Sequence, residues 1–206
     1  MGNLKYLSIS DAEHFIAEVL CAVKVPAADA KIVAQLMVKS DLVGADGHGI
    51  FRLPAYLKRI RAGGVNLNPN IRVEREKGAT ALINGDNGLG HLVMNKAVEV
   101  AIEKVKEHSV CWVGSHYGNH SGAASVYVRK LAEQGYIGIY MAVGNANHMA
   151  PWGGIDLLLS TNPIAIAVPA GDGPMVLLDI ATTVAAYGKV KLAAQKGEEM
   201  PNDWMI

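Results

Sequence analysis

His48 and Arg52 are the residues whose types and spacing most directly predict chemistry. They lie in the stretch GADGHGIFRLPAYLKRIRAGG at 44–64, where Gly47 and Gly49 flank the histidine. Flanking glycines let the backbone approach a ligand, and an unperturbed imidazole titrates near pH ~6.5, which suits proton transfer. The arginine offers a planar fork that matches a carboxylate, although a solvated residue at a helix start explains it equally well. Together the two side chains could hold a small acid while a proton moves at the neighbouring carbon.

A second pair of histidines, His116 and His120, has the i, i+4 spacing that would suit a metal ion on a helix. Gly118 and Asn119 between them favour a loop, and the sequence has no HExxH motif, so we predict no metal site. His120 is instead predicted to lie just before a helix that begins near Ser121. The backbone N–H groups of such a helix start could receive a phosphate or an amide.

Three further segments place polar or small residues at the ends of predicted elements. Thr161 precedes the apolar run in STNPIAIAVPA. Asp179 ends the run in LLDIATT, where it is either a helix N-cap or an acceptor for a ribose or carboxamide. Lys189, after Gly188, is either a solvated helical lysine or a cofactor contact. His91 is predicted to be a helix N-terminal residue without a direct role.

A glycine cluster in INGDNGLGH is the place to test for a nucleotide loop. Its glycines are spaced G-x-x-G-x-G, the reverse of the dinucleotide fingerprint, and no Walker lysine follows. We interpret it as a tight strand-to-helix turn. A dinucleotide would therefore have to bind without a Rossmann fold.

The first part of the chain, which must position His48 and Arg52, has helical periodicity. A capping-box serine, Ser10, opens one predicted helix, a second begins near Pro26, and Pro54 opens a third that Gly63-Gly64 ends. We therefore predict a small helical domain at 1–65.

The rest of the chain alternates between two periodicities. Strand-like runs in IRVERE, ATALING, VCWVGS, YIGIYMAV, IAIAVPA and MVLLDIA alternate with helical patterns at about 89–107, 121–134 and 184–196. This order predicts an α/β domain at 66–206 with a mixed or parallel sheet. EEMPNDWMI ends in three large apolar residues, Trp204, Met205 and Ile206, which suggests a chain cut short.

Composition narrows the class of protein. Lys+Arg and Asp+Glu number 19 each, so no net field attracts nucleic acid or an anionic membrane. The N-terminus has no signal-peptide pattern, and no apolar stretch reaches the length of a membrane span. The two cysteines, Cys21 and Cys111, are predicted to be small buried residues in a reducing compartment. We expect a cytoplasmic protein whose partners are small molecules and other protein chains.

Taken together, four segments closely resemble the malate/L-lactate/ureidoglycolate dehydrogenase family, the group with the sulfolactate-dehydrogenase-like fold. They are GHGIFRLPAYLKRIRAGGVN, GNHSGAASVYVRKLAEQGYIGIYMAVGNANHMAPWGG, STNPIAIAVPA and LLDIATTVAAYGKV. The motifs HG-x-x-R-L-x-x-Y, N-H-x-G-A, P-W/F-G-G, T-N-P and D-x-A-T-x-x-x-x-G-K occur in order over essentially the whole chain. NHSGAAS and LLDIATTVAAYGKV lean toward the ureidoglycolate branch, while malate and lactate stay open.

The resemblance implies an oxidoreductase that depends on NAD or NADP and moves a hydride between nicotinamide and C2 of a small 2-hydroxy or 2-oxo acid. It further implies a homodimer with a non-Rossmann cofactor domain beside a helical domain. His48 is the implied proton donor or acceptor, and His120 is the second candidate. The implied substrate contacts are Arg52, Tyr56 and Thr161. The implied cofactor contacts are His120, Ser121, Gly122, Ala123, Asp179, Ile180, Ala181, Gly188 and Lys189.

Two departures from the family pattern define the alternatives. Many members have a serine directly before the histidine of the HG motif, whereas this chain has Gly47, and Asp46 is the nearest substitute. Family chains also continue beyond the position that matches Trp204. The alternative to an enzyme is therefore a truncated, non-catalytic remnant that acts, if at all, by protein association through an uncovered apolar edge.

Overall fold

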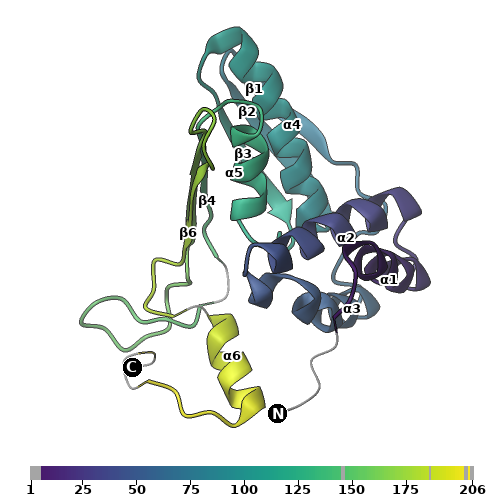
Figure 1. Cartoon of the computed structure of the whole chain (residues 1–206), viewed down its shortest axis with the longest axis vertical. Coiled ribbons are helices and arrows are strands. Elements are labelled where there is room, and N and C mark those ends of the chain that lie inside the picture. Colours follow the sequence, from purple (N-terminus) through teal and green to yellow (C-terminus); the bar gives the residue numbers. More distant parts are fainter. Residues whose placement is uncertain (1–5, 145–146, 186, 202–203, 205–206) are drawn as a thin grey trace. The chain divides into compact units, whose positions relative to one another are not determined.

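The computed structural model describes residues 6–144, 147–185, 187–201 and 204 (Figure 1). The chain divides into two compact units, Met1–Val126 and Tyr127–Ile206, and each is described by itself.

Helices open the first unit. In chain order, the elements before its sheet are α1 (Ile9–Ala22), α2 (Ala27–Leu42), the short 3-10 turns η1 (Asp46–His48) and η2 (Ile50–Arg52), and α3 (Leu53–Arg61). α1 and α2 pack side by side (Figure 1).

Local chemistry explains where these helices begin. Ser8 caps α1, since its hydroxyl accepts a hydrogen bond from the Asp11 backbone N–H at 3.1 Å, so the predicted cap at Ser10 is wrong by two residues. Pro26 is the N-cap of α2 and Pro54 lies in the first turn of α3, as predicted. A proline fits there because those backbone positions need no helical N–H donor.

The first sheet follows these helices. Its strands are β1 (Arg72–Lys77), β2 (Thr80–Gly88) and β3 (Trp112–Gly118), in the order β1-β2-β3. β1 and β2 are antiparallel, whereas β2 and β3 run parallel because α4 (Gly90–His108) carries the chain back between them. Ile83 of β2, which is completely buried, packs with Val93 and Val100 of α4. The predicted mixed sheet is confirmed.

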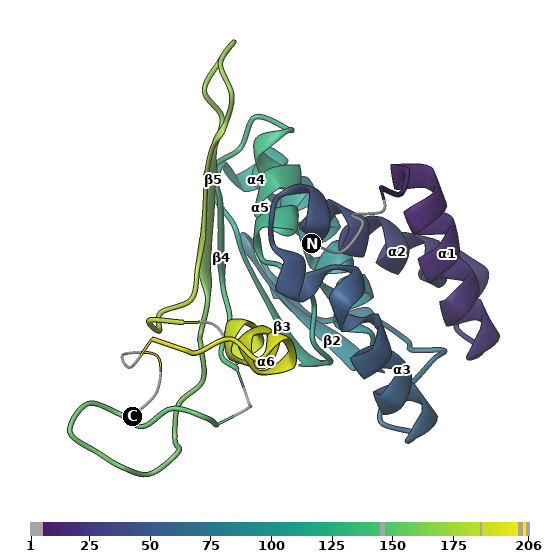
Figure 2. The same cartoon turned by 60° about the horizontal axis from the view of Figure 1, so that its bottom comes forward.

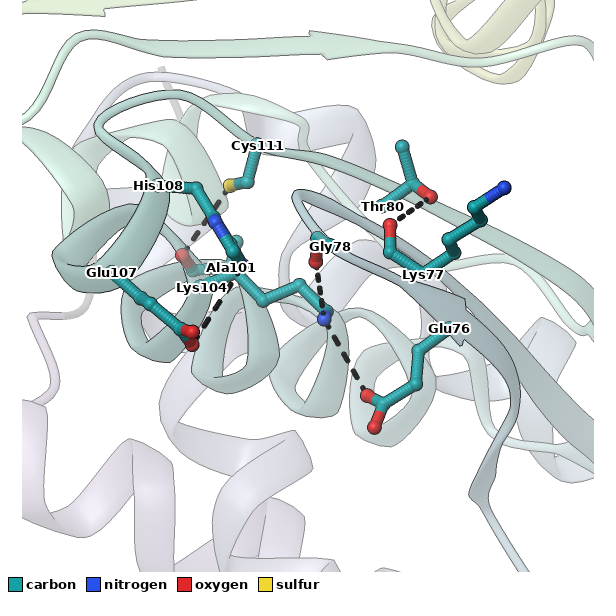
Figure 3. A network of polar contacts seen from close by, with 9 residues as sticks. All are labelled: Glu76, Lys77, Gly78, Thr80, Ala101, Lys104, Glu107, His108 and Cys111. Atoms are coloured by element: carbon teal, nitrogen blue, oxygen red, sulfur yellow. Dashed lines mark hydrogen bonds and ion pairs between the residues drawn. The ribbon is translucent and has the colours of Figure 1, made fainter.

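A polar network ties α4 to the turn between β1 and β2 (Figure 3). The Lys104 ammonium donates to the Gly78 carbonyl at 2.9 Å and lies 3.5 Å from the Glu76 carboxylate. Nearby, the Cys111 thiol donates to the Ala101 carbonyl at 3.3 Å and is half-buried. The other cysteine, Cys21, is exposed, so the prediction that it is buried is wrong.

The main core of the first unit lies between the N-terminal helices and the start of α4. Ile16 and Leu20 of α1 and Val33 and Met37 of α2 are completely buried in it. Leu92 of α4 joins the same cluster. The helical segment and the start of α4 therefore share one hydrophobic core, which fixes the segment that carries His48 against α4.

The second unit is built on an antiparallel sheet in the order β4-β5-β6 (Figure 2). Its elements are β4 (Gly138–Met141), β5 (Ile164–Val168), β6 (Val176–Ile180) and α6 (Tyr187–Lys196), and α5 (Ser125–Ala132) leads into it. Tyr127 of α5 stacks on Tyr140 of β4 with ring centroids 5.9 Å apart. A Cβ on Gly138 would lie 2.9 Å from the Val128 carbonyl oxygen, so this glycine allows α5 to approach β4 closely.

One face of this second sheet is apolar throughout. The register places Ile139 opposite Ile166, and Ile166 opposite Leu178. On β4 and β6 these side chains are largely exposed, with Ile139 at 57% and Leu178 at 41%. We call this the apolar sheet face; its residues are Ile139, Met141, Ile164, Ile166, Val168, Val176, Leu178 and Ile180.

The predicted α/β class is confirmed, but the described residues form two three-stranded sheets instead of one. The predicted helical domain at 1–65 lies in the same compact unit as the first sheet, and a separate domain there stays a prediction. Of the apolar C-terminal residues, Trp204 is half-buried, while Met205 and Ile206 lie outside the described residues. Within the described ranges, no helix has both the length and the apolarity to cross a membrane.

Candidate functional site

The segment between α2 and α3 carries three of the predicted site residues. His48 ends η1, Arg52 ends η2, and Tyr56 lies in the first turns of α3. Tyr56 is buried, whereas His48 and Arg52 are half-buried. The HG-x-x-R-L-x-x-Y motif therefore corresponds to two short turns and a helix start that present an imidazole, a guanidinium and a phenol in succession.

Asn119 fixes the turn that follows β3, directly before His120. Its side-chain amide donates to the carbonyls of Asn87 at 2.8 Å and Gly88 at 3.0 Å, and its amide oxygen accepts from Arg59 Nε at 2.6 Å. One residue thus ties the end of β2 and α3 to the turn. This network positions His120 beside the α2–α3 segment.

His120 lies against Tyr56 and His48. The Tyr56 hydroxyl is 2.7 Å from His120 Nδ1, and the His120 ring stacks on His48 with centroids 5.3 Å apart and planes at 20°. The Gly122 backbone N–H also donates to Nδ1, at 3.3 Å. Because a backbone N–H can only donate, Nδ1 is an acceptor, and the neutral ring carries its proton on Nε2.

His91, in the first turn of α4, is fully buried beside this pair. Its ring meets Tyr56 edge-on, with centroids 5.4 Å apart and planes at 89°. Neither of its ring nitrogens has a hydrogen-bond partner among the residues that the structure describes. A Cβ on Gly122 would lie 2.8 Å from His91 Nε2, and Gly122 has a φ of 81°, so only glycine suits position 122.

These five residues, His48, Arg52, Tyr56, His91 and His120, are called the imidazole cluster below. Burial, together with the Arg52 charge and the neighbouring His48 and His91, lowers the pKa of His120 to about 2. Burial also lowers the pKa of His91 to about 3, with a smaller effect from His48. Burial raises the pKa of Tyr56, although Arg52, which is hydrogen-bonded to the phenol, opposes the shift. His91, His120 and Tyr56 are therefore neutral beside a fixed positive charge.

Arg52 is the fixed charge of the imidazole cluster. Its Nε is buried and has no hydrogen-bond partner within the described part of the chain. A buried guanidinium donor is costly unless it meets an acceptor, and a carboxylate is the acceptor that its fork fits best. The cluster thus has the charge and the donors of a small-anion site.

The remaining N-H-x-G-A residues surround His120 without all facing solvent. Ser121 and Gly122 are half-buried, and Ala123 is 1% exposed. Ala123 therefore packs inside the first unit in this structure, and any cofactor contact at this position would use its backbone.

In the second unit, the predicted substrate and cofactor residues gather at one end of the sheet. The Thr161 carbonyl accepts hydrogen bonds from the backbone N–H and the hydroxyl of Thr182, at 2.9 and 3.0 Å. Thr161 precedes β5, and Asp179 and Ile180 end β6 with Ala181 following, so the T-N-P and D-x-A-T motifs are neighbours. Asp179 and Ile180 are exposed.

Gly188 and Lys189 lie in the first turn of α6, where Gly188 is half-buried and Lys189 is exposed.

His116, the other histidine of the i, i+4 pair, lies on β3 with its Nε2 2.6 Å from the Glu74 carboxylate. Within the described ranges, no three or more histidine, cysteine or acidic residues form a cluster suited to a metal ion.

The burial of His91 was not predicted from the sequence. Its position at a helix start was predicted correctly, but this histidine was given no part in the site. The available signal was its helical phase: His91 lies seven residues before Val98, which is also buried, and therefore on the inner face of α4.

The chain is similar in sequence and structure to proteins of one known family. A family model described as malate/L-lactate dehydrogenase matches residues 7–206. The malate dehydrogenase of Pyrococcus horikoshii is 45% identical over 192 residues, which is 93% of this chain and 53% of that protein. Its solved structure superposes with a TM-score of 0.88 at 42% identity, over 93% of this chain and 54% of that one.

Two further relatives broaden the comparison. The solved sulfolactate dehydrogenase of Methanocaldococcus jannaschii has a TM-score of 0.86 at 40% identity, covering 95% of this chain and 56% of that one. A ureidoglycolate dehydrogenase (NAD(+)) of Escherichia coli is 32% identical over 97% of this chain and 57% of its own length. Identity is thus higher to the malate than to the ureidoglycolate enzyme, which does not favour the ureidoglycolate branch.

The chain spans about half the length of the curated relatives it matches. The sulfolactate-dehydrogenase-like fold implied by the sequence motifs is confirmed by these structures. The chain therefore belongs to the malate/L-lactate dehydrogenase family.

Proposed function

We propose that this chain provides the acid/base and carboxylate-binding groups of an NAD(P)-dependent, homodimeric 2-hydroxyacid dehydrogenase. In the oxidative direction, C2 of the acid loses a hydride to the oxidised nicotinamide and its hydroxyl loses a proton, which gives the 2-oxo acid and the reduced cofactor. The observation that supports this proposal best is the imidazole cluster, in which neutral rings and a phenol surround one arginine.

Arg52 would bind the substrate carboxylate. Its buried Nε lacks a protein acceptor among the described residues, and its side chain also hydrogen-bonds Tyr56. A carboxylate on this fork would be held in one orientation, which sets the position of C2. It would also cancel the positive charge that helps to lower the pKa of His120, so substrate binding and imidazole chemistry are linked.

The two stacked histidines would both act on the substrate oxygen, one as a hydrogen-bond donor and the other as the acid/base. With Nδ1 occupied by the Tyr56 hydroxyl and the Gly122 N–H, His120 offers its Nε2–H as a hydrogen-bond donor. His48, stacked on that ring, would take the hydroxyl proton in oxidation and return it in reduction. His120 is the second candidate for this acid/base role.

A nicotinamide cofactor would supply the hydride acceptor or donor. At the turn 120–123, a cofactor contact would use the half-buried Ser121 and the backbone, since the space beside Gly122 is filled by the His91 ring. In the second unit, the exposed end of β6 offers an apolar residue, Ile180, beside an acidic one, Asp179, a combination that suits an aromatic ring and a ribose. Ala181, Gly188 and Lys189 would contribute further contacts, and Thr161 would touch the substrate.

Relatives in this family are named for malate, sulfolactate and ureidoglycolate, and these acids share a 2-hydroxy carboxylate group. That shared group is what Arg52 and the stacked histidines would recognise. The proposed substrate class is therefore the small 2-hydroxy or 2-oxo acid, with malate as the first to assay.

The proposal is tested by two substitutions in this protein, assayed for 2-hydroxyacid dehydrogenase activity. His48→Ala should lower kcat by about 10²–10⁴, the usual contribution of positioned acid/base catalysis. Arg52→Lys keeps the charge but loses the fork, so it should raise KM for the acid and leave KM for the nucleotide nearly unchanged. His116→Ala is the matched control, because His116 of β3 is paired with Glu74 of β1. This variant should change neither kcat nor KM. Activity within a few-fold of wild type for His48→Ala would exclude His48 and turn attention to His120.

A second candidate function, association without catalysis, is favoured by the apolar sheet face, five of whose residues are more than 40% exposed. Size-exclusion chromatography and titration of NAD(P)H fluorescence separate the two functions. A dimer that binds the nucleotide supports the dehydrogenase, whereas self-association without nucleotide binding supports the second candidate.

A further inference from the structure

His48 and Arg52 lie on two consecutive 3-10 turns that meet at one residue. His48 is the last residue of η1, Arg52 is the last residue of η2, and Gly49 joins them with φ −87° and ψ −141°. The backbone at Gly49 and Ile50 therefore sets how the imidazole lies relative to the guanidinium. Whatever holds this junction also holds the geometry between the proposed acid/base and the proposed carboxylate clamp.

Asp41, near the end of α2, is the side chain that meets this junction. The Ile50 backbone N–H donates to Asp41 Oδ2 at 2.9 Å. The carboxylate also packs against Gly49 so closely that a Cβ built there would overlap both carboxylate oxygens. One carboxylate thus accepts from the first residue of η2 and fills the space beside the glycine that precedes it.

The environment of Asp41 is unfavourable for a negative charge. Burial raises the pKa of this carboxyl, the nearby Asp46 raises it further, and the hydrogen bond from Ile50 partly offsets both effects. A half-buried carboxyl of this kind is kept where its oxygens make a defined contact. Here both the hydrogen bond and the packing are made to the backbone that connects His48 to Arg52.

We propose that Asp41 is a positioning residue for the reaction: it acts through the Gly49–Ile50 backbone to hold His48 and Arg52 in register. This inference rests on the proposed function for its kinetic consequences, but the contact itself does not. Loss of the Asp41 contact would let η1 and η2 move relative to each other. A displacement of about 1 Å at a reacting group costs up to ~10²-fold in rate.

The experiment is a double-mutant cycle at Asp41 and Gly49, assayed for 2-hydroxyacid dehydrogenase activity. Asp41→Ala removes the acceptor and should lower kcat/KM by ~10–100-fold, with both a lower kcat and a higher KM for the acid. Asp41→Asn keeps an acceptor oxygen of the same size and should stay within about threefold of wild type. Gly49→Ala displaces the carboxylate and should resemble Asp41→Ala. The double variant should be no worse than either single one, because both remove the same contact.

Asp29→Ala is the matched control, since Asp29 is also an aspartate of α2 whose pKa is raised by burial. Asp29→Ala should change kcat and KM little, whether or not it lowers the thermal stability. If Asp41→Ala does not fold, Gly49→Ala carries the test with Asp41 still in the chain. Unchanged kinetics for Asp41→Ala, strictly additive losses in the double variant, or an Asp41→Asn variant as impaired as Asp41→Ala would each overturn the proposal.

A readout without catalysis separates this inference from the proposed function. The His48 and Arg52 side-chain signals can be followed by NMR in the protein without substrate or cofactor. Relative to wild type, both signals should shift in the Asp41→Ala and Gly49→Ala variants, and not in Asp41→Asn. If the wild-type protein transfers no hydride, the proposed function fails. The NMR shifts would still support the positioning role of Asp41, and their absence would overturn it.

Discussion

The two units differ in how far their own residues enclose the groups that the proposed reaction uses. In the first unit, His91 is fully buried, Tyr56 is 7% exposed, and the helices and α4 share a core of buried side chains. In the second unit, the candidate cofactor residues lie at the exposed end of β6, next to the apolar sheet face. The first unit therefore builds the imidazole cluster from its own contacts.

This difference separates two physical tasks. Acid/base and anion geometry depends on packed, desolvated side chains, because burial and neighbouring charge hold the imidazoles neutral. A surface that receives an apolar group instead needs exposed area, and the apolar sheet face has it. The comparison predicts that equal substitutions have unequal effects in the two units.

The largest expected difference is between Ile83→Thr and Ile139→Thr. Ile83 in β2 is completely buried, so losing apolar volume and burying a hydroxyl should cost about 2–4 kcal/mol of unfolding free energy. Ile139 in β4 is 57% exposed, and the same change should stay within about 0.5 kcal/mol. Threonine keeps the β-branch in both, so strand propensity is matched. Urea unfolding with amide hydrogen exchange resolved by strand measures each unit, and equal costs would contradict the comparison.

The pH dependence of stability should also distinguish the units. His91 and His120 have pKa values of about 3 and about 2 when folded, far below the ordinary 6.5, so unfolding lets both bind protons. The contribution of the two neutral histidines to the free energy of unfolding is complete above pH 6.5. As the pH falls below 6.5, the free energy of unfolding decreases by about 1.4 kcal/mol per pH unit for each histidine. The pKa of Asp41 is raised in the folded protein, so its protonation at lower pH increases the free energy of unfolding instead. Between pH 6.5 and 5 the first unit should therefore lose stability steeply.

The same strand-resolved hydrogen exchange, repeated at several pH values, checks this prediction. Exchange in β2 should accelerate as the pH falls by more than intrinsic exchange chemistry predicts, and exchange in β5 should not. His91→Gln removes one of the two titrating rings and should reduce the slope for β2 by about half. An unchanged slope in that variant would show that His91 is not held neutral by the fold.

Much of this arrangement could be predicted from the sequence, and the rest shows what one-dimensional patterns leave out. The positions of α2, α3 and α4 followed from prolines, glycines and helical periodicity, which are local signals. The pairing of His120 with Tyr56 joins residues 64 positions apart, and no local pattern encodes it. Family motifs predicted that both matter but not that they touch.

The exposure of the second sheet is the clearest case of a missing signal. Apolar runs predicted β5 and β6 correctly as strands, yet such a run describes equally a sheet face covered by another layer and a face left open. His91 and Asp41 show the opposite limit. Both are polar residues in helices, where a solvated face is the usual interpretation, and their burial depends on which segment packs over them.

The smallest expected effect is at Gly47, where the enclosed first unit is open. A Cβ at this position would meet no atom within 4 Å, and the φ of Gly47 lies outside the left-handed range. Gly47→Ser, which restores the residue common in the family pattern, should change the unfolding free energy by no more than about 0.5 kcal/mol. It should change kcat by less than about threefold, because no contact of His48 or Arg52 with the rest of the cluster is removed.

The matched contrast is Gly49→Ala, two residues further on, where the Asp41 carboxylate occupies the space that a side chain would need. Thermal unfolding and steady-state kinetics of the two variants measure the difference. A Gly47→Ser variant as impaired as Gly49→Ala would mean that both glycines serve packing. A tolerated serine would show that the two glycines beside His48 have separate causes: Gly49 makes room for Asp41, and Gly47 leaves the approach to the imidazole open.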